Sequence, residues 1–131
     1  MQVREASGVV PYMIKNDRLY IMLVKSSNGN RWVLPKGGLE SDQTKKSNAA
    51  KEAYEEAGVI LKAKIKLGSY EMIKERKELN KVYMFAGRID KILEEYPEVN
   101  IRKRKLVTFN EAMKKLDPFQ QVFLVKLYES L

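Results

Sequence analysis

The sequence predicts a single mixed α/β domain in which strands, one central helix, further strands and a terminal helix form a layered sandwich. Two observations support this prediction. Strand-sized apolar runs lie on both sides of one long segment that contains neither Gly nor Pro, and an amphipathic segment closes the chain. The 131 residues are enough for one well-packed core. Because no internal repeat, low-complexity tract or linker is visible, we expect one domain over residues 1–131.

Three extended segments are expected before the central helix. Residues 6–14 are rich in Val, Tyr and Ile and are typical of a strand, in which Pro11 indicates an edge or a bulge. The turn-forming residues 15–18 lead into a second strand over 19–25, so the two strands are predicted to form a hairpin. After a polar loop, residues 31–34 form a short extended piece that carries the only tryptophan.

The central helix is expected within residues 39–57, ending at Gly58, which tolerates the positive φ of a helix C-cap. Its narrow apolar face is made by Ala49, Ala50, Ala53, Tyr54 and Ala57. On the other face, offsets of three and four place Glu52 beside both Glu55 and Glu56. Such carboxylates repel one another unless a cation is present, and a hard divalent ion such as Mg²⁺ prefers oxygen ligands. The cluster therefore indicates either a metal site or a solvated acidic patch.

Further strands are expected after the central helix. They cover residues 59–67, 82–89 and 106–109. Residues 70–73 can extend the first of these strands, and residues 74–81 are predicted to form a charged connector.

Two helices are expected at the end of the chain. Asn110 is a suitable N-cap for a helix over residues 111–116. The Asp-Pro pair at 117–118 is typical of the start of a final amphipathic helix, which runs to about residue 131.

The composition excludes several kinds of chemistry. The chain contains no cysteine and no histidine, so disulfides, thiolate nucleophiles, zinc sites and a Ser-His catalytic pair are absent. Any general acid or base must therefore be a carboxylate, a lysine or a tyrosine. The first residues lack the apolar core of a signal peptide, and no apolar run reaches membrane-spanning length. We therefore expect a cytoplasmic protein that does not engage a membrane.

The net charge favours anionic partners. Lys and Arg total 25 against 17 Asp and Glu, which gives a formal charge of +8. Nucleic acid, anionic lipid and a small polyphosphate are all compatible with this charge. No recognisable RNA- or DNA-binding module is present, and the aromatic residues are not interleaved with the cations.

The spacing between the acidic helix and the glycines before it resembles the Nudix box. That motif consists of glycine, five residues, glutamate, seven residues and then Arg-Glu-apolar-x-Glu-Glu-x-Gly-apolar. The corresponding positions are Gly37, Gln43, Lys51, Glu52, Ala53, Glu55, Glu56, Gly58 and Val59. The resemblance implies a Nudix-type α/β/α sandwich with a mixed β-sheet.

Two positions depart from the motif. Gln43 stands where the box has Glu, and Lys51 stands where it has Arg. In the family these two positions usually form an ion pair that braces the loop against the helix. An amide and an ammonium can share one hydrogen bond, but a bidentate guanidinium–carboxylate pair is not possible here. The departures affect the brace and leave the three helix glutamates intact.

Short stretches outside the box resemble the diphosphoinositol polyphosphate phosphohydrolases, a branch of the family whose members also cleave diadenosine polyphosphates. These stretches lie at residues 4–6, 26–27, 31–32, 75–77 and 100–104. In that branch the basic stretches grip a heavily phosphorylated substrate. Asp117 and Lys105 depart from the branch, which carries a lysine and an acidic residue at these positions.

The resemblance assigns roles to individual residues. Glu52 and Glu56 would ligate Mg²⁺ or Mn²⁺, Glu55 would act as general base or as a further ligand, and the backbone carbonyl of Lys36 would be another ligand. The residues expected to bind substrate are Arg4, Ser26, Ser27, Arg31, Gly37, Gly38, Arg76, Lys77, Arg102 and Arg104. Without the family context, the basic stretches are equally typical of solvated surface charge. If residues 102–105 form a strand, Arg102 and Arg104 share one face.

The expected function is divalent-metal-dependent hydrolysis of a pyrophosphate linkage in a diphosphoinositol polyphosphate or diadenosine polyphosphate. The alternatives are a Nudix hydrolase of nucleoside triphosphates, ADP-ribose or RNA 5′ ends, a weakened Nudix-fold ligand-binding module, and a basic nucleic-acid-binding protein. The expected partner is a small anionic polyphosphate, and nucleic acid is expected only as a 5′-phosphorylated RNA substrate. The chain is expected to be a monomer or a homodimer.

Overall fold

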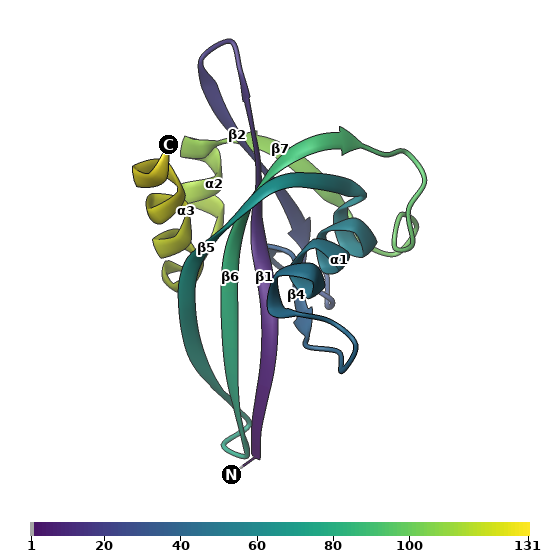
Figure 1. Cartoon of the computed structure of the whole chain (residues 1–131), viewed down its shortest axis with the longest axis vertical. Helices are drawn as coiled ribbons and strands as arrows, with labels where there is room; N and C mark the ends of the chain where they lie inside the picture. Colours follow the sequence, from purple (N-terminus) through teal and green to yellow (C-terminus); the bar gives the residue numbers. More distant parts are fainter. Residues whose placement is uncertain (1) are drawn as a thin grey trace.

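A mixed sheet of seven strands separates one helix from two others (Figure 1). The computed structural model describes residues 2–131. Helix α1 (Lys45–Ala57) packs on one face of the sheet, and helices α2 (Phe109–Lys115) and α3 (Pro118–Ser130) pack on the other. This arrangement confirms the predicted α/β/α sandwich with a mixed sheet.

The order of the strands places the start of the chain at the centre of the sheet. The strands are β1 (Gln2–Lys15), β2 (Arg18–Lys25), β3 (Trp32–Val33), β4 (Lys36–Gly38), β5 (Val59–Lys74), β6 (Glu78–Ile92) and β7 (Arg104–Thr108). Their spatial order is β3-β2-β1-β6-β5, with β4 paired to β1 and β7 paired to β2. Strands β1 and β6 run parallel, and the other pairs are antiparallel.

The predicted hairpin between β1 and β2 is confirmed. Asn16 and Asp17 form its turn with φ values of 52° and 63°. Two consecutive positive φ values are those of a type I′ turn, which Asn and Asp adopt more readily than other residues with a Cβ. Lys15 pairs with Arg18 directly across the turn.

The predicted connector over residues 74–81 is wrong. Strand β5 continues to Lys74 and β6 begins at Glu78, so only residues 75–77 form the turn, in which Glu75 and Arg76 have φ values of 54° and 59°. The strand residues that were predicted to lie in the connector are 74 and 78–81, and most of them are polar, so the sequence shows no apolar alternation there. Their extended conformation comes from backbone pairing among β1, β5 and β6, in which Gln2 and Lys74 both pair with Glu78.

The start of α2 also differs from the prediction. Thr108 is the N-cap, because its Oγ1 accepts a hydrogen bond from the backbone N–H of Glu111 at 3.2 Å. Asn110 therefore lies inside the first turn of the helix. Helix α3 begins as predicted, since Asp117 Oδ1 accepts from the backbone N–H of Gln120 at 3.0 Å.

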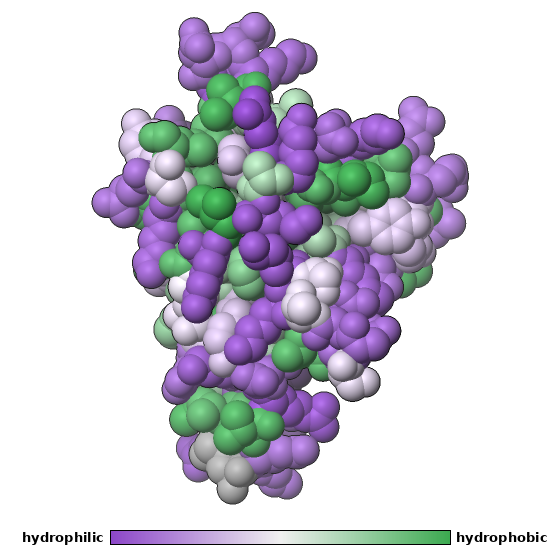
Figure 2. Space-filling model, in the orientation of Figure 1, coloured by the Kyte–Doolittle hydropathy of each residue, from purple (hydrophilic) through white to green (hydrophobic). Residues whose placement is uncertain are grey.

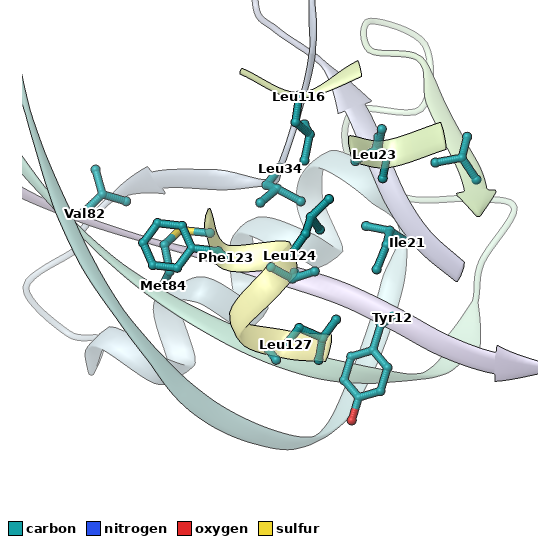
Figure 3. Packing of buried hydrophobic residues seen from close by; sticks show 14 of the residues in the cluster. Tyr12, Ile21, Leu23, Leu34, Val82, Met84, Leu116, Phe123, Leu124 and Leu127 are labelled. Carbon is teal, nitrogen blue, oxygen red and sulfur yellow. The ribbon is translucent and has the colours of Figure 1, made fainter. Parts of the chain in front are cut away.

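The larger part of the core lies between the sheet and α3 (Figure 3). Phe123, Leu124 and Leu127 are buried on the inner face of α3 and pack in one cluster with Ile21 and Leu23 of β2. Alternate residues of β2 point to opposite faces of the sheet, so this strand is buried on both sides.

The other part of the core lies between the sheet and α1. Met22 and Val24 of β2 pack there in one cluster with Ala49, Ala53 and Ala57. These three alanines are fully buried. Because alanine is small, α1 lies close to the sheet, and this close approach positions the acidic residues of the helix.

The visible face of the molecule is largely hydrophilic, with small apolar patches between the charged side chains (Figure 2). This surface agrees with the high content of charged residues, 32% of the chain. Over residues 2–131, no helix is both long enough and apolar enough to cross a membrane.

Candidate active site

Helix α1 is capped at both ends by local sequence. Thr44 and Ser47 form a reciprocal capping box at its start, with Thr44 Oγ1 accepting from the N–H of Ser47 at 3.0 Å. Gly58 ends the helix with φ 65°, as the sequence predicts. The alanine face packs on the sheet, which places Glu52 and Glu56, one turn apart, beside strand β4.

Gly37 lets the backbone of β4 approach Glu52. A Cβ built on Gly37 would lie 2.3 Å from the carboxyl carbon of Glu52 and 2.4–2.5 Å from its two oxygens. Any side chain at this position would therefore displace the carboxylate. The neighbouring Gly38 has open space at the same point, with no atom within 4 Å. The close approach explains why the first glycine of the box is required here.

Asn48 ties the loop before α1 to the sheet. Its side chain is fully buried, and Nδ2 donates to Ser7 Oγ at 3.0 Å and to the carbonyl of Gly37 at 3.3 Å. Its Oδ1 accepts from the backbone N–H of Glu40 at 3.3 Å. Asn48 was not singled out from the sequence, because an asparagine in a helix carries no local signal of such a role.

Glu52 and Glu56 form a carboxyl pair. Burial, aided by a hydrogen bond to Glu52, raises the pKa of Glu56 to about 8. Burial also raises the pKa of Glu52, which accepts that hydrogen bond from the Glu56 carboxyl. Glu56 is only 5% exposed, and neither side chain forms an ion pair within residues 2–131. Glu56 is buried and Glu52 is half-buried, and a pair of carboxyls in this setting fits a divalent metal ion, which prefers oxygen ligands and would replace the proton between them.

Glu55 is held differently. Lys51 Nζ donates to both of its oxygens at 3.0 Å and to Glu40 Oε1 at 3.1 Å. These bonds, first with Glu55 and then with Glu40, raise the pKa of Lys51. In the described part of the chain, no three acidic side chains are grouped closely enough to hold an ion as they stand. The structure thus brings Glu52 and Glu56 together, while Glu55 pairs with Lys51.

The brace between loop and helix uses a residue that the sequence analysis missed. Lys51 reaches Glu40 in the loop, whereas the family motif would pair it with residue 43. Gln43 contributes a backbone hydrogen bond to the carbonyl of Glu40 at 3.0 Å. Glu40 lies three residues before Gln43 in the same loop, and this nearby carboxylate was the feature of the sequence that could have indicated an alternative partner for Lys51.

A pocket of about 530 Å³ adjoins the carboxyl pair. Its charged lining residues are Arg31, Lys36, Glu56, Lys74, Arg102 and Asp117. Ser26 and Ser27 also line it, as the sequence analysis expected of substrate-binding residues. Burial lowers the pKa of Lys36, and the nearby Glu56 opposes that shift. Lys36 itself lines the pocket, in addition to the backbone role predicted for this residue.

Two of the pocket arginines are oriented by other residues. Arg102 Nε donates to Glu98 Oε1 and its Nη1 donates to the carbonyl of Lys25, both at 2.8 Å. Arg31 Nη1 lies 3.8 Å from Asp117 Oδ2. Asp117 thus caps α3 and also places an anion beside Arg31. The resemblance described above implies a lysine at this position.

The other residues expected to bind substrate lie outside the lining of this pocket. They are Arg4, Gly37, Gly38, Arg76, Lys77 and Arg104. Arg4 pairs with Glu78, and Arg76 and Lys77 form the turn between β5 and β6. Arg104 donates to the carbonyl of Ala57 at 2.8 Å, and its guanidinium lies 4.6 Å from the ring centre of Tyr96. Strand β7 begins only at Arg104, so the condition for Arg102 and Arg104 to share a strand face is not met.

Comparison with known proteins identifies the family of this chain. A family model described as the NUDIX domain matches residues 3–127. Nudix hydrolase 4 of Arabidopsis thaliana is 32% identical over 118 residues, which are 83% of this chain and 57% of the plant protein. Diphosphoinositol polyphosphate phosphohydrolase 3-alpha of Mus musculus is 35% identical over 113 residues, 82% of this chain and 68% of the mouse protein.

The fold is shared with solved structures as well. A C. elegans Ap4A hydrolase in a binary complex superposes with a TM-score of 0.70 at 17% identity, covering 97% of this chain and 96% of that one. This likeness concerns the fold alone. The chain spans only 57% of the length of the plant relative. The match of the NUDIX model to nearly the whole chain shows that this protein belongs to the Nudix hydrolase family.

Proposed function

We propose that the chain hydrolyses a pyrophosphate linkage in a polyphosphorylated substrate of the diphosphoinositol polyphosphate or diadenosine polyphosphate type, with Mg²⁺ or Mn²⁺ as cofactor. The observation that carries this proposal is the pairing of the half-buried Glu52 with the buried Glu56 at the edge of a pocket with four cationic lining residues. Nudix hydrolases act on pyrophosphate bonds. The name of the mouse relative supports the first of these substrate types, and the second rests on the resemblance of the sequence to the same branch of the family.

The metal would be held by Glu52, Glu56 and the backbone carbonyl of Lys36. When bound, a divalent ion neutralises the charge of the phosphates and lowers the pKa of a water molecule that attacks phosphorus. Lys36 and Arg102 would bind phosphate oxygens, because both line the pocket and Arg102 is preoriented by Glu98 and Lys25. Preorientation lowers the cost of ordering the guanidinium when the substrate binds.

Glu55 would accept the proton of the attacking water. The two hydrogen bonds from Lys51 hold the carboxylate of Glu55 in place, and a base must be positioned to act on the attacking water. Each oxygen of Glu55 keeps a free lone pair beside its bond from Lys51, so Glu55 can accept from a water molecule while Lys51 retains its bonds to Glu55 and Glu40.

A second candidate function is a ligand-binding module with weak catalysis. The pairing of Glu55 with Lys51 favours this alternative, because it leaves two acidic side chains together instead of three. Both candidates predict binding of a polyphosphate in the pocket. They differ in whether the bound substrate is cleaved.

A phosphate-release assay with Mg²⁺ and Mn²⁺ tests the proposal. The panel should contain diadenosine polyphosphates, inositol pyrophosphates, nucleoside triphosphates, ADP-ribose and 5′-triphosphorylated RNA. We expect turnover of at least one member, and loss of that turnover in Glu52→Gln with ligand binding retained. Glu129→Gln, on the exposed side of α3, is the matched control. Binding without cleavage of any member would favour the ligand-binding module.

A further inference from the structure

Asn48 lies in the same row of α1 as the two paired carboxyls. Asn48, Glu52 and Glu56 are each four positions apart, so they follow one another along one side of the helix. Asn48 bonds the carbonyl of Gly37, and a Cβ on the same glycine would lie 2.3 Å from the carboxyl carbon of Glu52. One residue of β4 is therefore in contact with two successive turns of α1.

The register of β4 determines which of its carbonyls are free. Two backbone hydrogen bonds flank the pair of Ser7 and Gly37, each two residues away from it: Val9 N–H to the carbonyl of Pro35 at 3.1 Å and Leu39 N–H to the carbonyl of Glu5 at 2.9 Å. Every second pair of an antiparallel ladder is hydrogen-bonded, so Ser7 and Gly37 form such a pair, and Lys36 directs its carbonyl away from β1. Over residues 2–131, β4 pairs with no strand other than β1. The carbonyl of Lys36 is therefore available to a metal ion.

The amide of Asn48 joins three segments of the chain around these groups. Its Nδ2 donates to Ser7 Oγ on β1 at 3.0 Å and to the carbonyl of Gly37 on β4 at 3.3 Å, and its Oδ1 accepts from the N–H of Glu40 in the loop at 3.3 Å. Asn48 and Ser7 are both fully buried, so water does not compete for the bond between them. An apolar residue at position 48 would deprive all three groups of this partner.

A metal site tolerates little movement of its ligands, because the distances from ion to ligand vary by only about 0.2 Å. The carbonyl of Lys36 belongs to β4, whereas the carboxyls of Glu52 and Glu56 belong to α1. The distance between the two kinds of ligand therefore depends on how β4 lies against the helix. Strand β4 has only three residues and a single neighbouring strand, so a side-chain bond from α1 has a large share in fixing its position.

We propose that Asn48, acting with Ser7, is a positioning residue that holds β4, and with it the carbonyl of Lys36, beside the carboxyl pair. Asn48 acts through β4 and does not itself bind the metal or the substrate. Position 48 is one of the seven that the box leaves unspecified between residues 43 and 51. The inference rests on the proposed function and adds to it two residues that the motif does not assign.

Titration calorimetry of the metal-free protein with Mg²⁺ measures this role separately from catalysis. Asn48→Ala should lower the Mg²⁺ affinity by at least about ten-fold. Ser7→Ala removes one of the three bonds and leaves Asn48 in place, so it should lower the affinity by a smaller factor, about three-fold.

Gln121→Ala is the matched control. Gln121 is also an amide that bonds the backbone, since its Nε2 donates to the carbonyls of Met113 and Leu116 at 2.8 and 3.0 Å. It belongs to α3, which lies across the sheet from α1. Its replacement should leave the Mg²⁺ affinity within about two-fold of wild type, because the two sites share no partner.

Wild-type Mg²⁺ affinity in Asn48→Ala would overturn the inference. An equal loss in Gln121→Ala would also overturn it, because the effect would then reflect a general loosening of the fold. Thermal unfolding establishes that each variant is folded. If Asn48→Ala does not fold, Ser7→Ala decides the question, and wild-type affinity in that variant overturns the inference.

The phosphate-release assay distinguishes failure of this inference from failure of the proposed function. Mg²⁺ binding that depends on Asn48, without cleavage of any substrate, contradicts the hydrolase and leaves the positioning role standing. Turnover by the wild type together with unchanged Mg²⁺ affinity in Asn48→Ala contradicts the positioning role alone. A wild type that binds neither Mg²⁺ nor Mn²⁺ contradicts the metal site and the inference with it.

Discussion

Lys51 Nζ lies 3.0 Å from each carboxylate oxygen of Glu55 and also contacts Glu40 in the preceding loop. One ammonium therefore joins the loop to α1 and holds the proposed general base. The family motif assigns the brace to an Arg and a Glu, and here a lysine with two other carboxylates takes that place. The brace is preserved in function although both of its motif residues differ.

Replacing Lys51 tests this brace. Lys51→Met should change the free energy of unfolding only slightly, because the ion pairs are partly exposed. Turnover should fall by about ten-fold or more, which is the typical effect of removing a residue that holds the residues of a metal site in position by hydrogen bonds. Lys46→Met, an exposed lysine in the first turn of α1, is the control and should retain full turnover. A Lys51→Met enzyme with wild-type kcat would contradict the role of the brace.

Gly37→Ala should impair metal binding through steric displacement. The added methyl would lie about 2.4 Å from an oxygen of Glu52, so the carboxylate must move. We expect at least about a ten-fold loss of Mg²⁺ affinity, measured by titration calorimetry, because the affected group is a proposed ligand. Gly38→Ala has open space at its Cβ and serves as the control. Equal Mg²⁺ affinity in both variants would show that Glu52 does not contact the ion.

The raised pKa of Glu56 predicts how stability depends on pH without metal. The folded value is about 8 against an ordinary value of 4.5, so the folded protein holds a proton that the unfolded chain has released between these pH values. The stabilisation is complete below about pH 4.5 and is lost as pH rises through about 8. Urea unfolding of metal-free protein should show lower stability at pH 9 than at pH 6, and Glu56→Gln should reduce the difference.

The affinity for Mg²⁺ should depend on pH in the direction opposite to that of stability. Because the ion replaces the proton shared by Glu52 and Glu56, Mg²⁺ affinity should increase as pH rises from 6 to 9. Calorimetry in buffers of different ionisation enthalpy would measure the proton released. A pH-independent affinity in the wild type would mean that the pair is not the site of binding.

Arg102→Met and Arg104→Met should differ in their effect on KM although the residues are two positions apart, and both variants should lose some stability because each arginine bonds a backbone carbonyl. Arg102→Met removes a cation from the pocket and should raise KM for a polyphosphate by about ten-fold, because a charge-assisted contact is worth about 1.5–3 kcal/mol. Arg104→Met removes the bond to the carbonyl of Ala57 at the end of α1 and should lower stability by about 1–2 kcal/mol. Steady-state kinetics and urea unfolding of both variants would separate the two roles, and a KM effect of Arg104→Met alone would reverse the assignment.

Local sequence was sufficient to predict the acidic helix α1. The alanine period determines which side of α1 meets the sheet, and a helix of 3.6 residues per turn then places Glu52 and Glu56 on neighbouring turns of one face. Gly58 ends the helix through its own backbone freedom, and Asn16 and Asp17 close the hairpin in the same way. These features depend on residues within one or two turns of each other, so their pattern is visible in the sequence.

The pocket was decided by contacts between distant parts of the chain. Arg102 lines the pocket, whereas Arg104 bonds the end of α1. The two arginines differ in role because β7 begins at Arg104 and Arg102 lies in the loop before it, which the run of cations in the sequence does not reveal. The exposed Met72 and Phe119 come together only because α3 packs across the end of β5. Sequence alone determined a helix that carries Glu52, Glu55 and Glu56 on one side, because helical geometry is local. Only the tertiary structure decided which cations and apolar groups surround them, because pairing of remote strands sets those distances.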